Sequence, residues 1–420
     1  MPGPLSHLTV LDLSRVLAGP WCTQLLADLG ATVIKIEKPG SGDDTRGWGP
    51  PFLKDMAGND TGEAAYYLAC NRGKRSVAID FTQPEGRDLV RALARGADVV
   101  VENYKVGSLA RHGLDYAGLS AINPRLVYCS ITGFGQTGPY ADRAGYDFIV
   151  QGMGGFMSVT GERDGLPGGG PQKAGIAIAD IMTGMYASTA IVAAVAARDA
   201  AGAQGRGQHI DAALLDTTVA MMAVMNMNYL VSGRAPGRAG NAHLSIVPYE
   251  VFRCADGHLI LGVGNDSQFA KFCAIAGTPE WAADPRFAKN ADRVAHRATL
   301  VPMVAAVILG RTRRAWLDAL EAAGVPCGPI NTIDEVFADP QVVARGMQFA
   351  LPHPLAGTLP QVANPLRFSA TPVAYDRPPP LLGEHTAAVL RERLALADDA
   401  IAGLAARGVI GIAACPDGPR

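Results

Sequence analysis

The sequence lacks the patterns that mark several common classes of protein. Its seven cysteines are scattered without a Cys-x-x-Cys pair, and its eight histidines are isolated from one another, so no zinc site is indicated. It contains no His-Glu-x-x-His motif, no P-loop and no Gly-x-Ser-x-Gly motif. Metal catalysis and a serine triad therefore have no local support, and an odd set of unpatterned cysteines is typical of reduced thiols in a cytosolic protein.

An excess of one charge is also missing. The chain has 37 Lys and Arg against 39 Asp and Glu, so no bulk attraction to nucleic acid or membrane is expected, and any anion site must be local. Residues 1–7 carry no basic segment and no long apolar run follows, so no secretion signal is predicted. The most apolar stretch, 178–198, contains Asp180 and many alanines and is interpreted as a buried helix. We expect a cytoplasmic protein.

What the sequence does contain is a regular alternation of strand and helix patterns. A helical pattern begins near Pro20, and Thr82 and Glu85 form a Thr-x-x-Glu sequence that predicts a capping box for a second helix. Short apolar runs predict strands at 8–13, 31–37, 76–81, 98–102 and 126–132. This alternation predicts an α/β fold whose parallel sheet is covered by helices on both faces.

The later part of the chain indicates a second domain. Long helices are predicted at 177–200 and 211–230, and a segment rich in Gly, Arg and Pro follows at 232–240. Beyond it, the pattern of residues 249–263 predicts a hairpin with its turn at Asp256–Gly257. We therefore predict a large domain at 1–228, a smaller α/β domain at 229–335 and a return to the large domain at 336–420.

The sequence Gly133-Phe-Gly135-Gln-Thr-Gly138 fits the pattern Gly-x-Gly-x-x-Gly after a predicted strand. A dinucleotide site requires a helix to begin within these glycines, so that its N-terminus meets the pyrophosphate. Here Pro139 follows at once, and no helical spacing comes after it. The segment is therefore interpreted as a glycine-rich turn.

Two features could carry chemistry. Asp180 is a lone carboxylate in an apolar run, and burial would raise its pKa. It is either a carboxylate that caps the N-terminus of its own helix or a functional group. Basic residues also gather in the first part of the chain and are either a solvated surface or a phosphate site at strand ends: Lys38, Arg46, Arg72, Lys74, Arg75, Lys105 and Arg111.

Together with further short motifs in order along nearly the whole chain, these residues resemble the class III CoA-transferase family, the formyl-CoA and carnitine CoA-transferase group. The motifs are Leu17-Ala-Gly-Pro20, Val33–Gly40, Asp44–Trp48, Asn71–Ser76, Val101–Tyr104, Ile122–Arg125, Gly133–Pro139, Gly145-Tyr146-Asp147, Asp180-x-x-x-Gly184, Gly205–Asp211, Gly324–Pro329 and Leu382–Thr386. The resemblance implies an enzyme that uses a CoA thioester as substrate and holds no permanent cofactor.

The resemblance assigns roles to individual residues. Asp180 is the implied nucleophile, which takes CoA as an aspartyl thioester after a mixed anhydride. The implied CoA site comprises Val16, Lys38, Asn103, Tyr104 and Arg111, with Arg72, Lys74 and Arg75 as nearby phosphate-binding candidates. The implied substrate pocket comprises Leu17, Tyr146, Asp147, His243 and Ser245.

Substrate and reaction remain open between alternatives. Leu17 replaces a glutamine, and residues 240–248 replace the four-glycine loop of the formyl-CoA enzymes, which argues against oxalate and formate. His243 and Ser245 are candidates for binding a second carboxylate, as in succinate or glutarate, the acids of the branch that the motifs resemble. Related α-methylacyl-CoA racemases use a His where this chain has Tyr146, and tyrosine is a poor base at neutral pH. A CoA-binding protein without catalysis is the remaining alternative.

The resemblance also implies an architecture. We expect an open Rossmann-like large domain built from both ends of the chain, a small domain, and an interlocked homodimer with carboxylic acids and acyl-CoA as its other partners. The site would lie between domains, with the loop near His243 beside Asp180 across the dimer.

Overall fold

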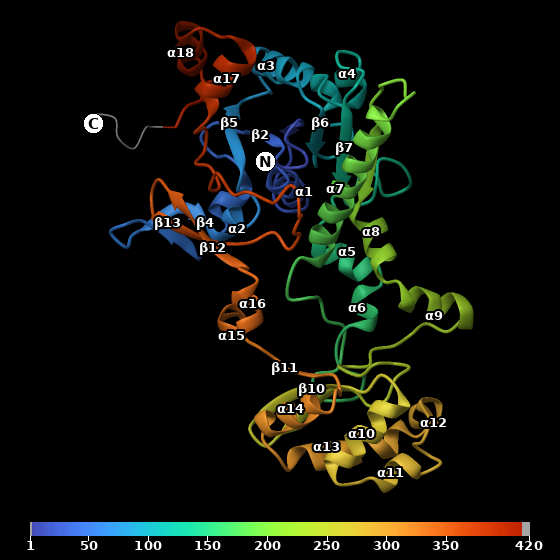
Figure 1. The fold of residues 1–420 in the computed structure, drawn as a ribbon. Helices are drawn as coiled ribbons and strands as arrows, with labels where there is room; N and C mark the ends of the chain where they lie inside the picture. The colour runs from blue at the N-terminus through green and yellow to red at the C-terminus, as the bar shows by residue number, and fades with distance from the viewer. Residues whose placement is uncertain (1, 414–420) are drawn as a thin grey trace. The chain divides into compact units, whose positions relative to one another are not determined.

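The computed structural model describes residues 2–413 and divides the chain into two compact units (Figure 1). The first unit comprises Met1–Phe156, Ala174–Val231 and Val343–Arg420, and the second comprises Met157–Lys173 and Ser232–Val342. The sequence-based division at 228 and 335 stays a prediction. It placed 157–173 in the large domain, whereas that segment groups with the second unit, where Gly161 accepts a hydrogen bond from the backbone of Gly240 at 3.1 Å.

The first unit is built on a seven-stranded sheet in the order β14-β5-β2-β1-β6-β7-β8. Its strands are β1 (Thr9–Asp12), β2 (Thr32–Glu37), β5 (Lys74–Ile79), β6 (Val99–Glu102), β7 (Val127–Thr132), β8 (His209–Ala213) and β14 (Ile410–Gly411). Every neighbouring pair is parallel except β14 with β5. This is the doubly wound Rossmann-like order that we expected, and its direction reverses between β1 and β6, where such sheets bind ligands.

Helices cover both faces of this sheet because alternate strand residues are apolar on each side. One core contains Leu11, Ile34 and Val77 with residues of α3, α4, α17 and α18, and the other contains Val10 and Val33 with residues of α1, α7 and α8. These helices are α1 (Ala18–Asp28), α3 (Pro84–Arg95), α4 (Tyr116–Ser120), α7 (Ile178–Asp199), α8 (Leu214–Met221), α17 (Thr386–Leu394) and α18 (Asp398–Ala406). The C-terminal part of the chain packs against its N-terminal part here, since α17 contacts β5 and α3 (Figure 1).

Smaller elements complete the first unit. They include two antiparallel hairpins, β3–β4 and β12–β13. Their bounds and those of the other elements are β3 (Phe52–Lys54), β4 (Asp60–Ala64), β12 (Gln348–His353), β13 (Gly357–Val362), η1 (Asp44–Gly47), η2 (Ala110–His112), α2 (Ala65–Leu68), α5 (Asp147–Met153) and α9 (Val224–Ser232). Helices α6 (Phe156–Val159) and α16 (Pro340–Ala344) contain residues of both units.

The second unit has its own core around Phe269, Phe272 and Trp316. Its three-stranded antiparallel sheet has the order β11-β10-β9, and the expected hairpin is confirmed with its turn between Cys254 and Gly257. The elements are β9 (Tyr249–Cys254), β10 (Gly257–Gly262), β11 (Cys327–Pro329), α10 (Asp266–Ala276), α11 (Glu280–Ala283), α12 (Asn290–Ala295), α13 (Arg297–Leu309), α14 (Arg313–Ala322) and α15 (Ile333–Ala338).

Two local predictions are wrong. The helix predicted at 211–230 is a strand and two helices, because 209–213 pairs with β7 and the chain bends by 75° between α8 and α9, where Ala223 has a φ of 41°. The capping box at Thr82 does not form, because α3 begins at Pro84 and the Thr82 hydroxyl donates to Asp80 at 2.6 Å instead. In both cases a tertiary or local polar contact overrides the helical pattern.

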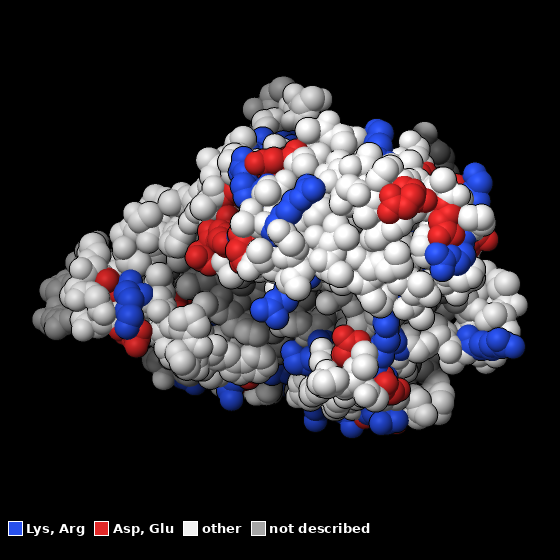
Figure 2. Space-filling model, turned by 90° about the horizontal axis from the view of Figure 1, so that it is seen from below, with Lys and Arg blue, Asp and Glu red and all other residues white. Residues whose placement is uncertain are grey.

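Helix α7 has the length and composition of a membrane span, as the bent pair α8–α9 also has. Nevertheless, α7 packs against α1, β7 and β8, and its residues Ala179, Ala187 and Ile191 are fully buried in the core. It is therefore a core helix of the sheet. Figure 2 shows Lys, Arg, Asp and Glu interspersed over the displayed face among large uncharged areas, as the near-zero net charge suggests.

The strand ends carry a buried network of charges. Asp12 on β1 pairs with Lys74 on β5 at 3.0 Å, and both side chains are fully buried. Lys35 on β2 pairs with Asp43 at 2.9 Å, also fully buried, and donates to the carbonyl of Ser14 at 2.8 Å. Although burial raises the carboxyl pKa of Asp12, Lys74 and Lys35 outweigh it and the net pKa is lowered. The network ties the loop after β1 to two neighbouring strands.

Replacing Lys74 with Met should destabilise the fold strongly, because it leaves the buried Asp12 carboxylate without its ion-pair partner. We expect a loss of about 3–5 kcal/mol in the free energy of unfolding, seen as a lower urea midpoint. Lys54→Met is the control, since Lys54 pairs with Asp60 across an exposed hairpin and its loss should cost about 0–1 kcal/mol. Equal midpoints for the two variants would contradict a structural role for the buried pair.

Candidate active site

Two cavities open at the carboxyl ends of the parallel strands, and Arg15, Asp44 and Tyr104 line both of them. The reaction cavity, of about 480 Å³, contains Asp180, and the entrance cavity, of about 530 Å³, contains Lys38 and Arg111. Every residue that lines them belongs to the first unit. The shared residues make the two cavities parts of one continuous site.

The loop after β1 forms one wall of the reaction cavity with Val16 and Leu17. Val16 has a φ of +70°, which is uncommon for a β-branched residue and must be held by its surroundings. Its N–H donates to the two carboxylate oxygens of Asp43 at 3.2 and 3.3 Å. Asn103, after β6, holds the preceding residue by accepting from the N–H of Arg15 and donating to its carbonyl.

Tyr104 follows Asn103 and separates the two cavities. Its N–H donates to Glu102 at 2.8 Å, and its ring packs edge to face against Phe81 with centroids 5.7 Å apart. Glu102 is buried, which raises its pKa to about 7 although Ser130 and the Tyr104 N–H donate hydrogen bonds to it. These contacts place Asn103 and Tyr104 on the wall of the reaction cavity, and their binding of CoA stays a prediction.

A close contact between two glycines builds the opposite wall. A Cβ on Gly145 would lie 2.3 Å from the Cα of Gly133, so neither position admits a side chain without displacing the other loop. This contact joins the glycine-rich turn after β7 to the segment that carries Tyr146 and Asp147. No helix begins within Gly133–Gly138, as expected for a turn rather than a dinucleotide site.

Asp147 holds the N-terminus of α7. Its Oδ1 accepts from the N–H groups of Ala179 at 2.7 Å and Asp180 at 3.2 Å, and its Oδ2 accepts from Gln151 at 2.6 Å. Asp147 therefore caps the helix that carries Asp180, which removes the alternative that Asp180 is itself the capping carboxylate. Within the described residues, the Asp180 carboxylate makes no hydrogen bond and lines the cavity.

The surroundings of Asp180 raise its pKa to about 7, through burial first and the negative charge of Asp147 second. Ionised and protonated forms of Asp180 therefore coexist near neutral pH. Gly184, one turn further along α7, lets the helix approach α1, because a Cβ there would lie 2.6 Å from the carbonyl oxygen of Ala18. The result is a half-buried, unpaired carboxylate that can act as a nucleophile on an electrophilic carbonyl.

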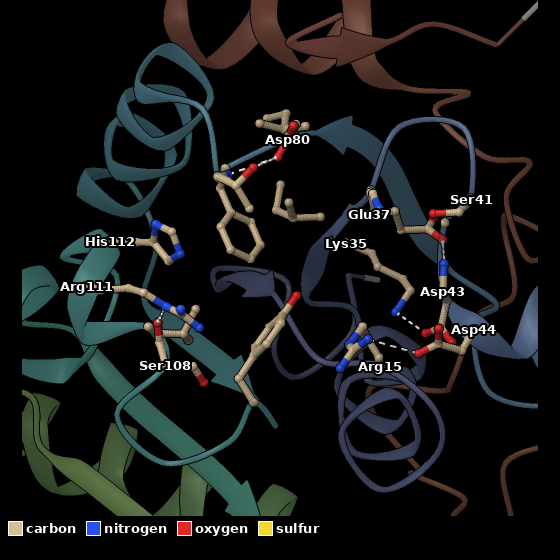
Figure 3. Close-up of a pocket in the computed structure, with 18 residues that line it drawn as sticks. Arg15, Lys35, Glu37, Ser41, Asp43, Asp44, Asp80, Ser108, Arg111 and His112 are labelled. Atoms are coloured by element: carbon tan, nitrogen blue, oxygen red, sulfur yellow. Dashed lines mark hydrogen bonds and ion pairs between the residues drawn. The ribbon is translucent and has the colours of Figure 1, made fainter.

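The entrance cavity presents exposed cations. Figure 3 shows Arg15, Lys35, Asp43 and Asp44 on one side and Ser108, Arg111 and His112 on the other. Arg111 is exposed, and its Nε donates to the carbonyl of Ser108 at 3.0 Å, which leaves its other N–H groups for a ligand. Lys38 is also exposed and lines this cavity. Both positions suit an anionic ligand such as a phosphate.

Three of the predicted phosphate-binding side chains do not reach either cavity. The Lys74 ammonium group donates three hydrogen bonds, to Asp12, to the carbonyl of Pro20 and to Asn71, at 2.9 to 3.0 Å. Arg72 forms a buried pair with Asp28 at 2.7 Å, and Arg75 pairs with Glu392 at 2.7 Å. These side chains hold the fold together and line neither cavity. Their binding of phosphate stays a prediction, which the geometry of the two cavities does not support.

His243 and Ser245 belong to the second unit and line neither cavity. The N–H of Ser245 donates to Nδ1 of His243 at 3.0 Å, which makes Nδ1 an acceptor and places the ring proton of the neutral imidazole on Nε2. Both side chains are exposed and can donate to a ligand oxygen. Their part in a substrate pocket stays a prediction.

Sequence reasoning missed several residues that line the reaction cavity, among them Arg15, Trp48 and Arg143. Arg15 could have been found, because it lies between a predicted strand and helix beside Val16, at the end of the sheet where ligands bind. Trp48 is placed through its edge-to-face contact with Tyr66, and no local pattern indicates that contact.

Comparison with known proteins identifies the family of the chain. The model of CoA-transferase family III matches residues 5–386, so the chain belongs to that family of enzymes. This confirms the resemblance stated from the sequence motifs.

Individual relatives span almost the whole chain. It is 56% identical to a succinate–glutarate CoA-transferase of Agrobacterium fabrum, over 93% of this chain and 95% of the relative. It is 42% identical to the succinyl-CoA:glutarate CoA-transferase of Homo sapiens, over 97% and 90%. Among solved structures, a CAIB/BAIF family protein from Brucella suis superposes with a TM-score of 0.81 at 50% identity, covering 94% of this chain and 100% of that one.

The raised pKa of Asp180 predicts a pH dependence for the first half-reaction. Because only the carboxylate is nucleophilic, kcat/KM for the acyl-CoA donor should rise with pH through an apparent pKa near 7. In Asp147→Asn the amide oxygen can still accept from the N-terminus of α7, but the negative charge is gone. The midpoint should therefore move to lower pH.

Asp142→Asn is the control, because Asp142 is an exposed acid in the same loop that does not line the cavity. Its pH profile should match that of wild type. A midpoint that stays in place in Asp147→Asn, or that moves equally in both variants, would contradict the assigned role of Asp147.

Proposed function

We propose that the enzyme moves CoA from succinyl-CoA to glutarate or a similar dicarboxylic acid through a thioester on Asp180. The observation that carries this proposal is the unpaired carboxylate of Asp180, which lines a cavity continuous with a cationic entrance. The substrates named for the relatives from Agrobacterium fabrum and Homo sapiens support the choice of acids.

The reaction proceeds in four balanced steps. The Asp180 carboxylate attacks the thioester carbonyl of the donor, which forms a mixed anhydride and releases the CoA thiolate. The thiolate attacks the Asp180 carbonyl, which frees the donor acid and leaves an aspartyl-CoA thioester. The acceptor carboxylate attacks this thioester, forming a second anhydride and thiolate. The thiolate then attacks the acceptor carbonyl, which gives the new acyl-CoA and restores Asp180.

The two cavities accommodate the parts of CoA separately. Lys38 and Arg111 in the entrance cavity would bind phosphates, and the pantetheine arm would pass Tyr104, Asn103 and Val16 to Asp180. Lys38 carries charge without the bidentate geometry of an arginine. His243 and Ser245 remain candidates to add hydrogen bonds to the substrate from a second copy of the chain.

A racemase reaction is the main alternative, and the position of Tyr146 disfavours it. Tyr146 is 64% exposed, and a tyrosine phenol is a weak base at neutral pH. Asp147 cannot replace the missing base, because its carboxylate accepts hydrogen bonds from the backbone of α7. Proton removal at Cα of the acyl group therefore lacks a partner at this position.

A homodimer is also proposed, on the basis of apolar helix faces that the first unit leaves uncovered. Helix α9 has no buried residue, and Leu230 and Val231 are 70% and 80% exposed. Phe148 and Ile149 on α5 are 57% and 46% exposed. Exposed apolar faces of this kind are typical of subunit interfaces.

We propose a cytoplasmic location and small-molecule substrates, without a nucleic-acid or membrane partner.

The central prediction concerns a covalent adduct. Mixing the enzyme with succinyl-CoA should increase its intact mass by the mass of CoA minus one water molecule. The Asp180→Ala variant should show no such increase. The same variant should lose transferase activity by roughly a thousandfold or more. Asp142→Ala is the matched control and should form the adduct normally.

Two results would contradict the proposal. One is a wild-type enzyme that forms no adduct with any of a panel of acyl-CoAs. The other is an Asp180→Ala variant that still transfers CoA. Exchange of the acyl α-proton into deuterium oxide, measured in parallel, would instead indicate the racemase alternative.

The dimer proposal predicts twice the chain mass of 43.8 kDa by light scattering at micromolar concentration. A Leu230→Asp, Val231→Asp double variant should shift the protein toward the monomer, because it places charge on the apolar face of α9. Met56→Asp is the control, since Met56 is 81% exposed at the tip of the β3–β4 hairpin. A wild-type monomer, or a dimer unaffected by the double variant, would contradict this interface.

A further inference from the structure

Arg15 lies where the two cavities meet, in the loop between β1 and α1. Its backbone is fixed by one side chain, because its N–H donates to Asn103 Oδ1 at 2.8 Å and its carbonyl accepts from Asn103 Nδ2 at 2.6 Å. The next residue, Val16, is fixed by Asp43. The base of the Arg15 side chain therefore has a defined position at the edge of the reaction cavity.

The guanidinium of Arg15 is only partly engaged. Nη1 pairs with Asp44 at 3.0 Å, but the two side chains are 42% and 51% exposed, and such a pair contributes little to stability. The guanidinium carbon lies 5.0 Å from the centroid of the Tyr104 ring. Among the described residues, Nε is buried and has no hydrogen-bond partner. A ligand oxygen that reached Nε after a turn of this half-exposed side chain toward the cavity would remove the cost of the unmet N–H.

We propose that Arg15 binds the distal carboxylate of the dicarboxylic acid whose other carboxylate reacts at Asp180. The Nε and Nη2 edge of a guanidinium presents two parallel N–H groups, which match the two oxygens of a carboxylate. Arg15 thereby sets the preference of the enzyme for diacids over monoacids. This inference rests on the proposed transfer reaction and adds the residue that selects its substrate.

The other two cations of the reaction cavity are less suited to this role. The guanidinium carbon of Arg143 lies 4.5 Å from the Tyr140 centroid, and Arg143 is exposed. Lys105 is an exposed point charge without the planar fork of an arginine. His243 and Ser245 can add hydrogen bonds, but a permanent positive charge comes from Arg15. Of these cavity cations, Arg15 alone combines a fixed backbone with a buried, unpaired N–H.

The competing role for Arg15 is binding the phosphates of CoA, since it also borders the entrance cavity. An experiment on the acceptor half-reaction separates the two, because the acceptor carries no phosphate. The full-length enzyme is loaded with saturating succinyl-CoA and freed of small molecules, and the loaded fraction is measured. It is then mixed with pentanedioate or pentanoate, which share a five-carbon chain and differ in the second carboxylate. Loss of the CoA adduct is followed by intact mass.

Wild type should react with pentanedioate at much lower concentration than with pentanoate. In Arg15→Gln the apparent second-order rate constant for pentanedioate should fall by roughly 10- to 100-fold, while that for pentanoate should change by less than about threefold. Arg15→Lys should recover part of the loss, since it restores the charge without the bidentate geometry. Thermal unfolding of each variant shows whether it is folded. If Arg15→Gln does not fold, Arg15→Lys tests the proposal in its place.

Three results would overturn this assignment. Equal losses on both acids would make Arg15 a positioning residue for CoA or for the loop. Unchanged selectivity in both Arg15 variants would exclude it from recognition. A diacid preference that is lost in Arg143→Gln and kept in Arg15→Gln would assign the carboxylate to Arg143. A wild-type enzyme that forms no adduct would instead refute the route through Asp180, a failure that is seen at the loading step.

Discussion

The ion pair between Asp12 and Lys74 crosses the interior of the parallel sheet with both side chains fully buried. A buried pair of this kind is tolerated only where the remaining donors and acceptors are also satisfied. Thr23 and Ser14 donate to Asp12, and Lys74 donates to backbone and amide oxygens. Through Lys35 and Asp43 the same network reaches Val16. The loop that borders both cavities is thus tied to charges on three strands.

A second carboxylate organises the chemistry at the opposite wall. Asp147 binds the first N–H groups of α7, so it fixes the helix that carries Asp180. The same negative charge adds to burial in raising the Asp180 pKa to about 7. Holding Asp180, the proposed nucleophile, in place and keeping it ionised are therefore in conflict. The helix N-terminus relieves this only partly, because its dipole favours the charged form of Asp180 while Asp147 opposes it.

The sequence predicted the doubly wound fold because strand and helix patterns are local. Through short motifs it also singled out Asp180, Asn103 and Tyr104, which line the reaction cavity and whose roles stay predictions. It could not predict the burial of Arg72, whose carbonyl partner Val362 is 290 residues away. It misread β8, because pairing with β7 decides that segment rather than its own periodicity. Its position after a predicted strand could have indicated Arg15, but the contacts of that residue could not be predicted. Asn103 fixes the backbone of Arg15 and Asp44 pairs with its guanidinium, and both residues approach Arg15 only in the folded chain.

The most direct test of the proposed anhydride mechanism follows the carboxylate oxygens of the acceptor acid rather than CoA. If the acceptor carboxylate attacks an aspartyl thioester and the thiolate then attacks the acceptor carbonyl, one acceptor oxygen must remain on Asp180. We therefore predict that turnover with succinyl-CoA and glutarate labelled with oxygen-18 in its carboxylates will place the label in the peptide that contains Asp180. Digestion in unlabelled water and peptide mass analysis would detect it. An active enzyme whose Asp180 peptide stays unlabelled would contradict the anhydride route and the role of Asp180 as nucleophile.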